Sequence, residues 1–397
     1  MYTGAKLKVA LVKPVMSMLR MRVPKTFVGP GTLAEIPEIF KSRDAKKAFI
    51  LASNTVTKSG MLDQLLKQLD EAQISYRIFN GVKPDPTFDI IDDALAQCND
   101  PDMVLAIGGG SVLDTAKAVA AAITNGGDAK KLVGMLKVKK PPVPMIFVPT
   151  TAGTGSEATI AAIISDDKTH LKKQILDTKI IPEFAVFDPN LMLGLPAHTR
   201  ATTVMDALTH ALEAYVSTYA RPETDKFAET AIKLIYENLP LALREPDNLK
   251  ALENLLVASF YAGQAFTKVY IGYVHAFSHA IGGKYGVSHG LGNAVLLPHV
   301  MAFYKETCAD RFAHLAELLN LEVQGSDNSS KAQAFVDSLF LLNQNSDIPS
   351  RLADFPASSI EQIIDLAFQE AHGTYPVPRY YTRQEAHMLL EKICAES

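Results

Sequence analysis

Residues 103–123 read "MVLAIGGGSVLDTAKAVAAAI": a short apolar run, three consecutive glycines, and an alanine-rich run opened by Ser111. The apolar run predicts a buried strand and the alanine-rich run predicts a helix. Three glycines permit backbone angles closed to other residues, so several N–H groups can point toward one place at the positive end of the helix dipole. With Asp114 completing a capping box, the stretch predicts a strand–turn–helix unit whose turn either receives a phosphate or is a tight connection without a ligand.

The same alternation continues on both sides of this stretch, from about residue 46 to residue 190. Apolar or β-branched runs alternate with helical patterns, and the runs are "KKAFILAS", "SYRIF", "MVLAIGG", "VPMIFVPT" and "FAVFDP". Repeated strand–helix alternation predicts a mostly parallel sheet covered by helices on both faces. From about residue 196 the sequence reads almost wholly as helices. We therefore expect an α/β domain at 1–195, with 1–21 as an N-terminal extension, and an all-helical domain at 196–397.

The composition excludes several classes of protein. The chain has 397 residues, 48% of them hydrophobic, and a formal net charge of −4, so it shows no excess of basic charge to attract a phosphate backbone. No stretch of about 18 uncharged apolar residues is present. The three cysteines are far apart and lack metal-binding spacing. We expect a cytoplasmic protein with no nucleic-acid partner and no membrane partner.

A second polar turn follows another predicted strand, in "VPTTAGTGSEAT" at 148–159. Its hydroxyl groups, on Thr150, Thr151 and Thr154, are neutral donors and acceptors suited to a sugar, a pyrophosphate or a ring amide. Taken alone, the turn can equally be a polar loop without a ligand. Two such turns at the carboxyl ends of neighbouring parallel strands favour a nucleotide, because open α/β sheets bind ligands at that edge.

A carboxylate and an imidazole interrupt an apolar helical pattern in "VMDALTHALEAYVS" at 204–217. In a helix, Asp206 and His210 lie one turn apart, about 6 Å along the axis, with both side chains on one face. Such a pair either contributes to a metal site, or its carboxylate and imidazole only form a hydrogen bond with each other.

Further histidines favour the first interpretation. The segment "YIGYVHAFSHAIGGKYGVSHGLGNAVLLPHVM" at 270–301 contains His275, His279, His289 and His299. His275 and His279 repeat the one-turn spacing, and Gly282 with Gly283 permits a chain reversal that returns His289 to the same point. One carboxylate and two or three imidazoles form a ligand set for Fe(II), or alternatively Zn(II). Spacing alone does not select between His275 and His279, and it does not exclude His299.

Four of these stretches together resemble the iron-containing (group III) alcohol dehydrogenases, in the same order and at similar spacing. They are "GGGSVLDTAKAVA", "PTTAGTGSEAT", "MDALTHALEAYVS" and "HAFSHAIGGKYGVSHGLGNAVLLPHVM", and the resemblance covers roughly residues 22–397. It implies an α/β nucleotide-binding domain followed by an all-helical metal-binding domain, the dehydroquinate-synthase-like two-domain architecture, with the active site in the cleft between the domains.

The resemblance also implies roles for individual residues. It implies that the metal ligands are Asp206, His210, His275 and His289. It implies that His279 is a catalytic histidine that transfers a proton. It implies that the coenzyme contacts are Gly109, Gly110, Ser111, Asp114, Thr150, Thr151, Thr154 and Lys172.

The chain departs from the family pattern at Ser53, which stands where many NAD-preferring members have an aspartate. The missing carboxylate removes both an acceptor for the ribose 2′-hydroxyl and the repulsion of a 2′-phosphate, and Lys58 can pair with that phosphate. The expected coenzyme is therefore NAD(H) or NADP(H), with Ser53 among its contacts.

The reaction implied by the resemblance is that of a metal-dependent, NAD(P)-linked alcohol dehydrogenase or aldehyde reductase. A hydride passes between C4 of the nicotinamide and the carbinol carbon of a small alcohol whose oxygen binds the metal. The family also implies a homodimer or a larger homo-oligomer. Two alternatives stay open: polyol oxidation of the glycerol dehydrogenase type, and a metal-dependent hydrolase in which both glycine-containing turns are structural. The sequence does not name the alcohol or aldehyde.

Overall fold

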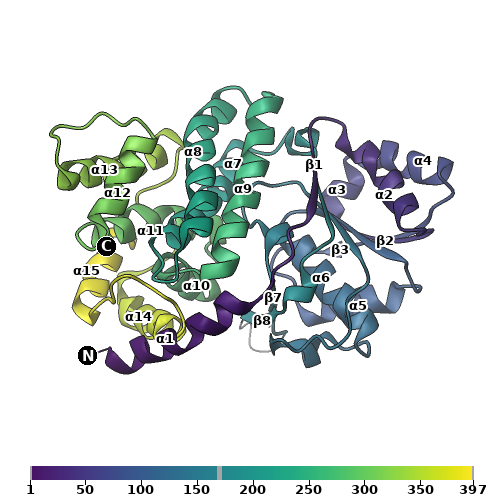
Figure 1. Cartoon of the computed structure of the whole chain (residues 1–397), viewed down its shortest axis with the longest axis horizontal. Helices are drawn as coiled ribbons and strands as arrows, with labels where there is room; N and C mark the ends of the chain where they lie inside the picture. Colours follow the sequence, from purple (N-terminus) through teal and green to yellow (C-terminus); the bar gives the residue numbers. More distant parts are fainter. Residues whose placement is uncertain (1, 168–171, 396–397) are drawn as a thin grey trace. The chain divides into compact units, whose positions relative to one another are not determined.

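The computed structural model describes residues 2–167 and 172–395 (Figure 1). By their internal contacts the residues form two compact units. The sheet unit comprises residues 20–194 and 247–263, and the helical unit comprises residues 1–19, 195–246 and 264–397. The chain thus passes from one unit to the other after residues 19, 194, 246 and 263.

The sheet unit is built on a parallel sheet with the strand order β1-β9-β6-β4-β2-β3. Its strands are β1 (Lys25–Val28), β2 (Lys47–Ser53), β3 (Ser75–Val82), β4 (Met103–Gly108), β6 (Met145–Pro149) and β9 (Phe184–Phe187). The five apolar runs of the sequence form β2, β3, β4, β6 and β9, so the predicted parallel sheet is confirmed. The sequence did not predict β1, a short edge strand.

Alternate residues of the central strands enter two separate hydrophobic cores. In β4, Val104 and Ala106 belong to one core, whereas Leu105 and Ile107 belong to the other. Helices α5 (Phe88–Gln97) and α6 (Gly110–Thr124) contribute to the first core, and α2 (Ile36–Ser42) and α4 (Asp63–Glu71) contribute to the second. Because successive strand residues point to opposite faces, these two cores show helices on both sides of the sheet, as predicted.

Shorter elements complete the sheet unit. A small second sheet, which the sequence did not predict, has the order β5-β8-β7, and its strands are β5 (Gly134–Met135), β7 (Ala161–Ser165) and β8 (Lys172–Leu176). Helix α3 (Asn54–Lys58) follows β2. The 3-10 turns of the sheet unit, among its described residues, are η1 (Thr32–Glu35), η2 (Ala129–Leu132), η3 (Ser156–Ala158), η4 (Thr178–Ile180) and η5 (Pro189–Met192). A further 3-10 turn, η6 (Ala357–Ser359), lies in the helical unit.

The helical unit contains no strand within its described residues, as predicted. Its helices are α1 (Thr3–Met18), α7 (Ala197–Val216), α8 (Pro222–Arg244), α10 (Tyr273–Tyr285), α11 (His289–Tyr304), α12 (Ala309–Leu318), α13 (Asn328–Asn345), α14 (Ile360–Ala371) and α15 (Arg383–Ile393). Helix α9 (Leu249–Val269) contributes residues to both units. Among the described helices, none is long and apolar enough to cross a membrane.

The first helix does not belong to the α/β domain in which the sequence analysis placed residues 1–21. By its contacts α1 is part of the helical unit. Val9 and Met16 are buried, the Tyr219 hydroxyl donates a hydrogen bond to the carbonyl of Val9, and the Tyr2 hydroxyl donates to the carbonyl of Tyr381 at 2.7 Å. This difference arises because the buried side chains of α1 find their partners far along the chain, which no local pattern reveals.

Residues 249–263 of α9 belong to the sheet unit, and the backbone of this part of the helix touches the threonine turn. Gly155 has φ +57, and a Cβ built on it would lie 2.6 Å from the carbonyl oxygen of Ser259 and 2.9 Å from Cα of Gly263. A Cβ on Gly263 would lie 2.6 Å from the carbonyl oxygen of Gly155. Two glycines therefore allow the turn and the helix to approach backbone to backbone.

Candidate active site

The glycine turn and the threonine turn lie against each other at the carboxyl ends of β4 and β6, which are neighbouring parallel strands. A Cβ built on Gly109 would lie 3.2 Å from Oγ1 of Thr151, and one built on Gly110 would lie 2.5 Å from Cγ2 of Thr154. The backbone N–H of Thr150 donates to the carbonyl of Gly108 at 3.0 Å. The structure thus brings together both turns that the sequence assigned to a nucleotide, with Ser111 in the first turn of α6.

The start of α6 differs from the predicted capping box. The helix begins at Gly110, its N-cap Gly109 carries no side chain, and no side-chain cap is formed. The carboxylate of Asp114 instead accepts hydrogen bonds from Oγ of Ser156 at 2.6 Å and from the N–H of Ile163 at 3.0 Å. Asp114 therefore ties the threonine turn to α6, and its predicted contact with a coenzyme stays a prediction.

A buried lysine reinforces this connection, and the sequence analysis missed it. Nζ of Lys117, one turn beyond Asp114, donates to the carbonyl and hydroxyl oxygens of Thr159 at 2.9 and 2.8 Å and to the carbonyl of Ala161 at 2.7 Å. Burial lowers the pKa of Lys117 to about 8, although Asp114 and Glu157 oppose that shift. Asp114 and Lys117 of α6 thus hold residues 156–163, the segment that follows Thr154.

The two remaining predicted coenzyme residues lie on other elements. Ser53 ends β2, the neighbour of β4, and its hydroxyl caps α3 by accepting from the N–H of Val56 at 3.3 Å. Lys172 begins β8 and forms an ion pair with Asp85. Ser53 therefore lies at the same sheet edge as the glycine turn, whereas Lys172 belongs to the small sheet.

The helical unit brings the four predicted metal ligands together. Asp206 and His210 lie on α7, His275 lies on α10, and His289 is the first residue of α11. One potential ligand atom from each of the four residues can be chosen so that all lie within 4.8 Å of one another. Asp206, His210 and His275 are buried, whereas the His289 side chain is 41% exposed.

The distances within this group fit a divalent transition metal. Nε2 of His275 lies 3.0 Å from Nε2 of His210 and 3.7 Å from Oδ1 of Asp206, and Nε2 of His289 lies 3.4 Å from the same oxygen. Ligand bonds of about 2.0–2.2 Å around one tetrahedral or octahedral centre place neighbouring ligand atoms roughly 2.8–3.6 Å apart. Three imidazole nitrogens and one carboxylate oxygen match the ligand preferences of Fe(II) and Zn(II).

The electrostatics of the group favour a cation. Burial opposes ionisation of Asp206, yet His210 and His289, with hydrogen bonds from His275 and His289, hold its pKa well below the usual range. Burial also opposes protonation of His275, but Glu213 and Asp206 outweigh it and raise the pKa of His275 to about 9. Two carboxylates therefore create a negative potential at this buried point, which stabilises positive charge there.

Glu213 is a member of the site that the sequence analysis missed. Its carboxylate accepts hydrogen bonds from Nδ1 of His275 at 2.6 Å and from the N–H groups of Gly272 and Val274, each at 2.7 Å. The carboxylate thereby keeps the proton of the His275 ring on Nδ1 and leaves Nε2 directed at the ligand group. The sequence did contain a pattern that could have identified Glu213. On α7 it lies seven residues after Asp206 and three after His210, so the three side chains share one face of the helix.

The chain reversal that returns His289 lies later than predicted. Gly282 and Gly283 are inside α10, and the helix ends at Gly286, which has φ +70. Gly286 adopts the left-handed conformation that commonly ends a helix. A Cβ on Gly290 would lie 2.5 Å from the carbonyl oxygen of Thr202, so this second glycine allows the start of α11 to pack against α7.

His279 lies beside the ligand group but is not a member of it. Its ring stacks on that of His289 with 5.2 Å between centroids. Nδ1 of His279 is 2.7 Å from Oε1 of Glu370, which also accepts a hydrogen bond from the Tyr375 hydroxyl. Glu370, also missed from the sequence, orients the His279 ring through Nδ1 and leaves Nε2 outside this hydrogen bond.

His299, which spacing alone did not exclude, lies elsewhere on α11. Its ring packs edge-on against Phe340, and it is not part of the ligand group.

Comparison with known proteins agrees with this architecture. Residues 24–189 match the family model described as iron-containing alcohol dehydrogenase, and residues 200–394 match the C-terminal model of the Fe-containing alcohol dehydrogenase family. The resemblance inferred from the four sequence stretches is therefore confirmed.

Individual relatives cover nearly the whole chain. An NAD-dependent methanol dehydrogenase of Bacillus methanolicus is 38% identical over 373 residues, 93% of this chain and 97% of the relative. A 1,3-propanediol dehydrogenase of Klebsiella pneumoniae is 36% identical over 368 residues, 90% of this chain and 94% of the relative. The crystal structure of a 1,3-propanediol oxidoreductase superposes with a TM-score of 0.90 at 35% identity, covering 94% of this chain and 99% of that one. The chain therefore belongs to the iron-containing alcohol dehydrogenase family and is an oxidoreductase of the alcohol dehydrogenase class.

Proposed function

We propose that this protein is a metal-dependent, NAD(P)-linked alcohol dehydrogenase that interconverts a small alcohol and its aldehyde. The hydride leaves the carbinol carbon for C4 of the oxidised nicotinamide, and the hydroxyl proton leaves for a base, so that alcohol and NAD(P)+ give aldehyde, NAD(P)H and a proton. The observation that carries the proposal is the convergence of one carboxylate and three imidazoles within 4.8 Å. The relatives that act on methanol and 1,3-propanediol support a small alcohol as the substrate.

The metal site consists of Asp206, His210, His275 and His289, and the family name supports iron as its metal. A divalent metal, when bound, supplies Lewis acidity that favours the alkoxide over the alcohol and polarises an aldehyde carbonyl. Asp206 contributes the negative charge of the ligand set, and Nδ2 of Asn293 donates to its Oδ1 at 2.7 Å. Asn293 therefore orients the carboxylate, as Glu213 orients His275.

His279 receives the proton in alcohol oxidation and returns it in aldehyde reduction. Its Nδ1 is bonded to Glu370, so Nε2 is the atom that exchanges the proton. The stacking of its ring on His289 supports this role, because it places His279 next to a metal ligand. Glu370 stabilises the imidazolium that forms when His279 takes up the proton.

The coenzyme binds at the sheet edge formed by the glycine turn, the threonine turn and Ser53. Backbone N–H groups at the start of α6 receive the pyrophosphate. Because Ser53 brings no carboxylate to the ribose, both NAD(H) and NADP(H) fit this edge. Lys172 and Asp114 remain proposed contacts, and so do Thr150, Thr151 and Thr154.

The proposal is tested with protein purified without air. Metal content is measured before and after chelation, and the apoprotein is reloaded with Fe(II) or Zn(II). Each form is assayed with methanol, ethanol, 1,3-propanediol and glycerol, in NAD+ and in NADP+. We expect coenzyme reduction that disappears on chelation and returns with metal. Undiminished turnover in the metal-free protein, or ester hydrolysis without a coenzyme, would contradict the proposal.

Replacing Glu213 with glutamine should weaken metal binding by about 10- to 100-fold, the range found when a partner that orients a metal ligand is removed. The amide keeps the size of the side chain but loses the charge and one acceptor oxygen that holds His275 and the start of α10. Metal affinity is measured by titrating apoprotein in competition with a chromogenic chelator. Glu237→Gln, on the exposed side of α8, is the matched control. Equal affinity in Glu213→Gln and wild type would show that Glu213 only supports the fold.

Three further expectations accompany the proposal. We expect a homodimer or larger homo-oligomer, a cytoplasmic location, and a domain boundary near residues 195 and 196. The relative that acts on a diol keeps polyols among the candidate substrates.

A further inference from the structure

The buried lysine of α6 has every donor of its ammonium group in use. Lys117 is 0% exposed, and lysines are almost never fully buried unless they are paired. Its three N–H groups meet three acceptors, which are the carbonyl and hydroxyl oxygens of Thr159 and the carbonyl of Ala161. Because a buried ammonium is stable only when its donors are satisfied, Lys117 fixes the position of residues 159–161 relative to α6.

The hydrogen bonds continue from Thr159 to Thr154, a proposed coenzyme contact. The N–H of Thr159 donates to the carbonyl of Ser156 at 3.1 Å, and the N–H of Ser156 donates to Oγ1 of Thr154 at 3.3 Å. Ser156 and Thr159 are both 3% exposed. Because Oγ1 of Thr154 accepts this bond, its own O–H group can still be donated to a ligand. The bonds therefore orient the Thr154 hydroxyl as a donor.

The position of Thr154 matters because this side chain lies against the start of α6. A Cβ built on Gly110 would lie 2.5 Å from Cγ2 of Thr154, so no space is left between the turn and the helix. Lys117 follows Gly110 by seven residues, a spacing that places both on the same face of α6. One face of one helix thus meets Thr154 at its first turn and holds Thr159 and Ala161 two turns later.

We propose that Lys117 is a positioning residue for the coenzyme, which acts through Thr159 and Ser156 on the hydroxyl of Thr154. The inference rests on the proposed function, in which the coenzyme contacts the threonine turn. Lys117 does not itself touch the coenzyme, since its three N–H groups are bonded within the protein. Its removal therefore weakens coenzyme binding and leaves the metal centre unchanged.

The test compares Lys117→Met with wild type. Methionine has a similar length but donates no hydrogen bond, and apolar replacement of a buried charge often leaves stability unchanged. The dissociation constants of NADH and NADPH are measured by fluorescence on metal-free protein, and kcat and KM are measured on metal-loaded protein. We expect coenzyme binding to weaken by about tenfold, the factor that corresponds to one lost hydrogen bond from a charged donor. The KM of the alcohol and kcat at saturating coenzyme should stay within about twofold of wild type.

Chemical rescue tests whether the ammonium group itself is required. In Lys117→Ala the truncated side chain leaves space for propylammonium, which together with the alanine Cβ rebuilds the lysine side chain. We expect propylammonium to restore the coenzyme affinity of this variant. Tetramethylammonium carries the same charge but no N–H donor, and it should restore none. Equal coenzyme affinities in the presence of the two cations would overturn the proposal.

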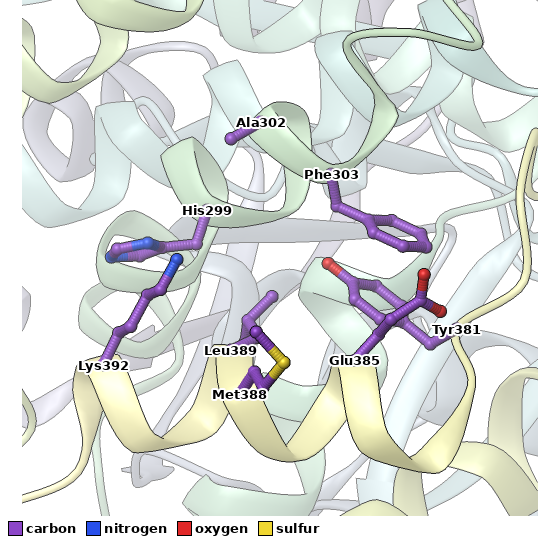
Figure 2. Close-up of a pocket in the computed structure, with 8 residues that line it drawn as sticks. All are labelled: His299, Ala302, Phe303, Tyr381, Glu385, Met388, Leu389 and Lys392. Atoms are coloured by element: carbon purple, nitrogen blue, oxygen red, sulfur yellow. The ribbon is translucent and has the colours of Figure 1, made fainter.

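Two control variants separate this role from charge and from stability. Lys392→Met removes a lysine from α15 in the helical unit, at the pocket shown in Figure 2, and should bind coenzyme as wild type does. Val119→Ala, in the hydrophobic core on another face of α6, should lower the urea midpoint of unfolding without weakening coenzyme binding.

The outcomes distinguish this inference from the proposed function. Wild-type coenzyme affinity in Lys117→Met, or an equal loss of affinity in Val119→Ala, would overturn the role of Lys117 alone. A wild-type protein that binds neither NADH nor NADPH would overturn the proposed function, and the role of Lys117 with it.

Discussion

Replacing Asp206 with asparagine is expected to lower alcohol oxidation by about 1000-fold and to leave the purified protein largely free of metal. Asp206 is the only carboxylate in the ligand group, and its Oδ1 lies within 4.0 Å of a ring nitrogen of each of the three histidines. Asparagine has nearly the same shape but carries no charge, so the positive charge of a divalent cation is no longer offset within its own ligand set.

The measurement is metal content by elemental analysis together with kcat at saturating coenzyme. Asp337→Asn, on the exposed face of α13, is the matched control and should retain both metal and activity. An Asp206→Asn protein that keeps wild-type metal content and loses less than about tenfold in kcat would show that the metal is held without this carboxylate.

Replacing Gly110 with alanine is expected to weaken coenzyme binding by about 10- to 100-fold without affecting the metal. The new Cβ would lie 2.5 Å from Cγ2 and 2.8 Å from Oγ1 of Thr154, closer than real contacts allow. The threonine turn cannot retreat easily, because Gly155, the next residue, is already in backbone contact with Ser259 and Gly263. The strain therefore falls on Thr154 and on the start of α6, which are both proposed coenzyme contacts.

Coenzyme affinity is measured by the fluorescence change when NADH or NADPH is added. Gly4→Ala is the matched control, because a Cβ built on Gly4 has no neighbour within 4 Å. Unchanged coenzyme affinity in Gly110→Ala would mean that the coenzyme does not use this turn. A loss of bound metal in the same variant would mean that the substitution disturbs more than the turn.

The elements that could be predicted are those whose hydrophobic pattern lies within the element itself. The central strands are continuous apolar runs, and each of β2, β4, β6 and β9 was recognised for that reason. Strand β1 has mostly exposed residues, and β5 is two residues long, so neither carries a periodic pattern. The assignment of α1 to the helical unit depends on contacts such as Tyr219 with Val9, which lie 210 positions apart.

The same distinction holds for the candidate site. One-turn spacing pointed to Asp206 with His210, but it treated His275 and His279 alike, and the family resemblance was needed to choose between them. The structure shows the physical difference: Nε2 of His275 faces His210, whereas His279 is bonded to Glu370, 91 positions away. Glu213 was detectable from helical spacing, and Glu370 was not. Metal and coenzyme binding by these residues stay predictions that the experiments above address.

The insertion of residues 247–263 into the sheet unit has a consequence for biosynthesis. When residue 194 leaves the ribosome, the parallel sheet is fully synthesised, but the helix segment that contacts Gly155 does not yet exist. At translation rates of about 5–20 residues per second, residues 195–263 take roughly 3–14 seconds to follow. During that interval the nascent chain exposes the surface that Gly263 will cover, so chaperone contact during synthesis should concentrate there rather than at the chain terminus.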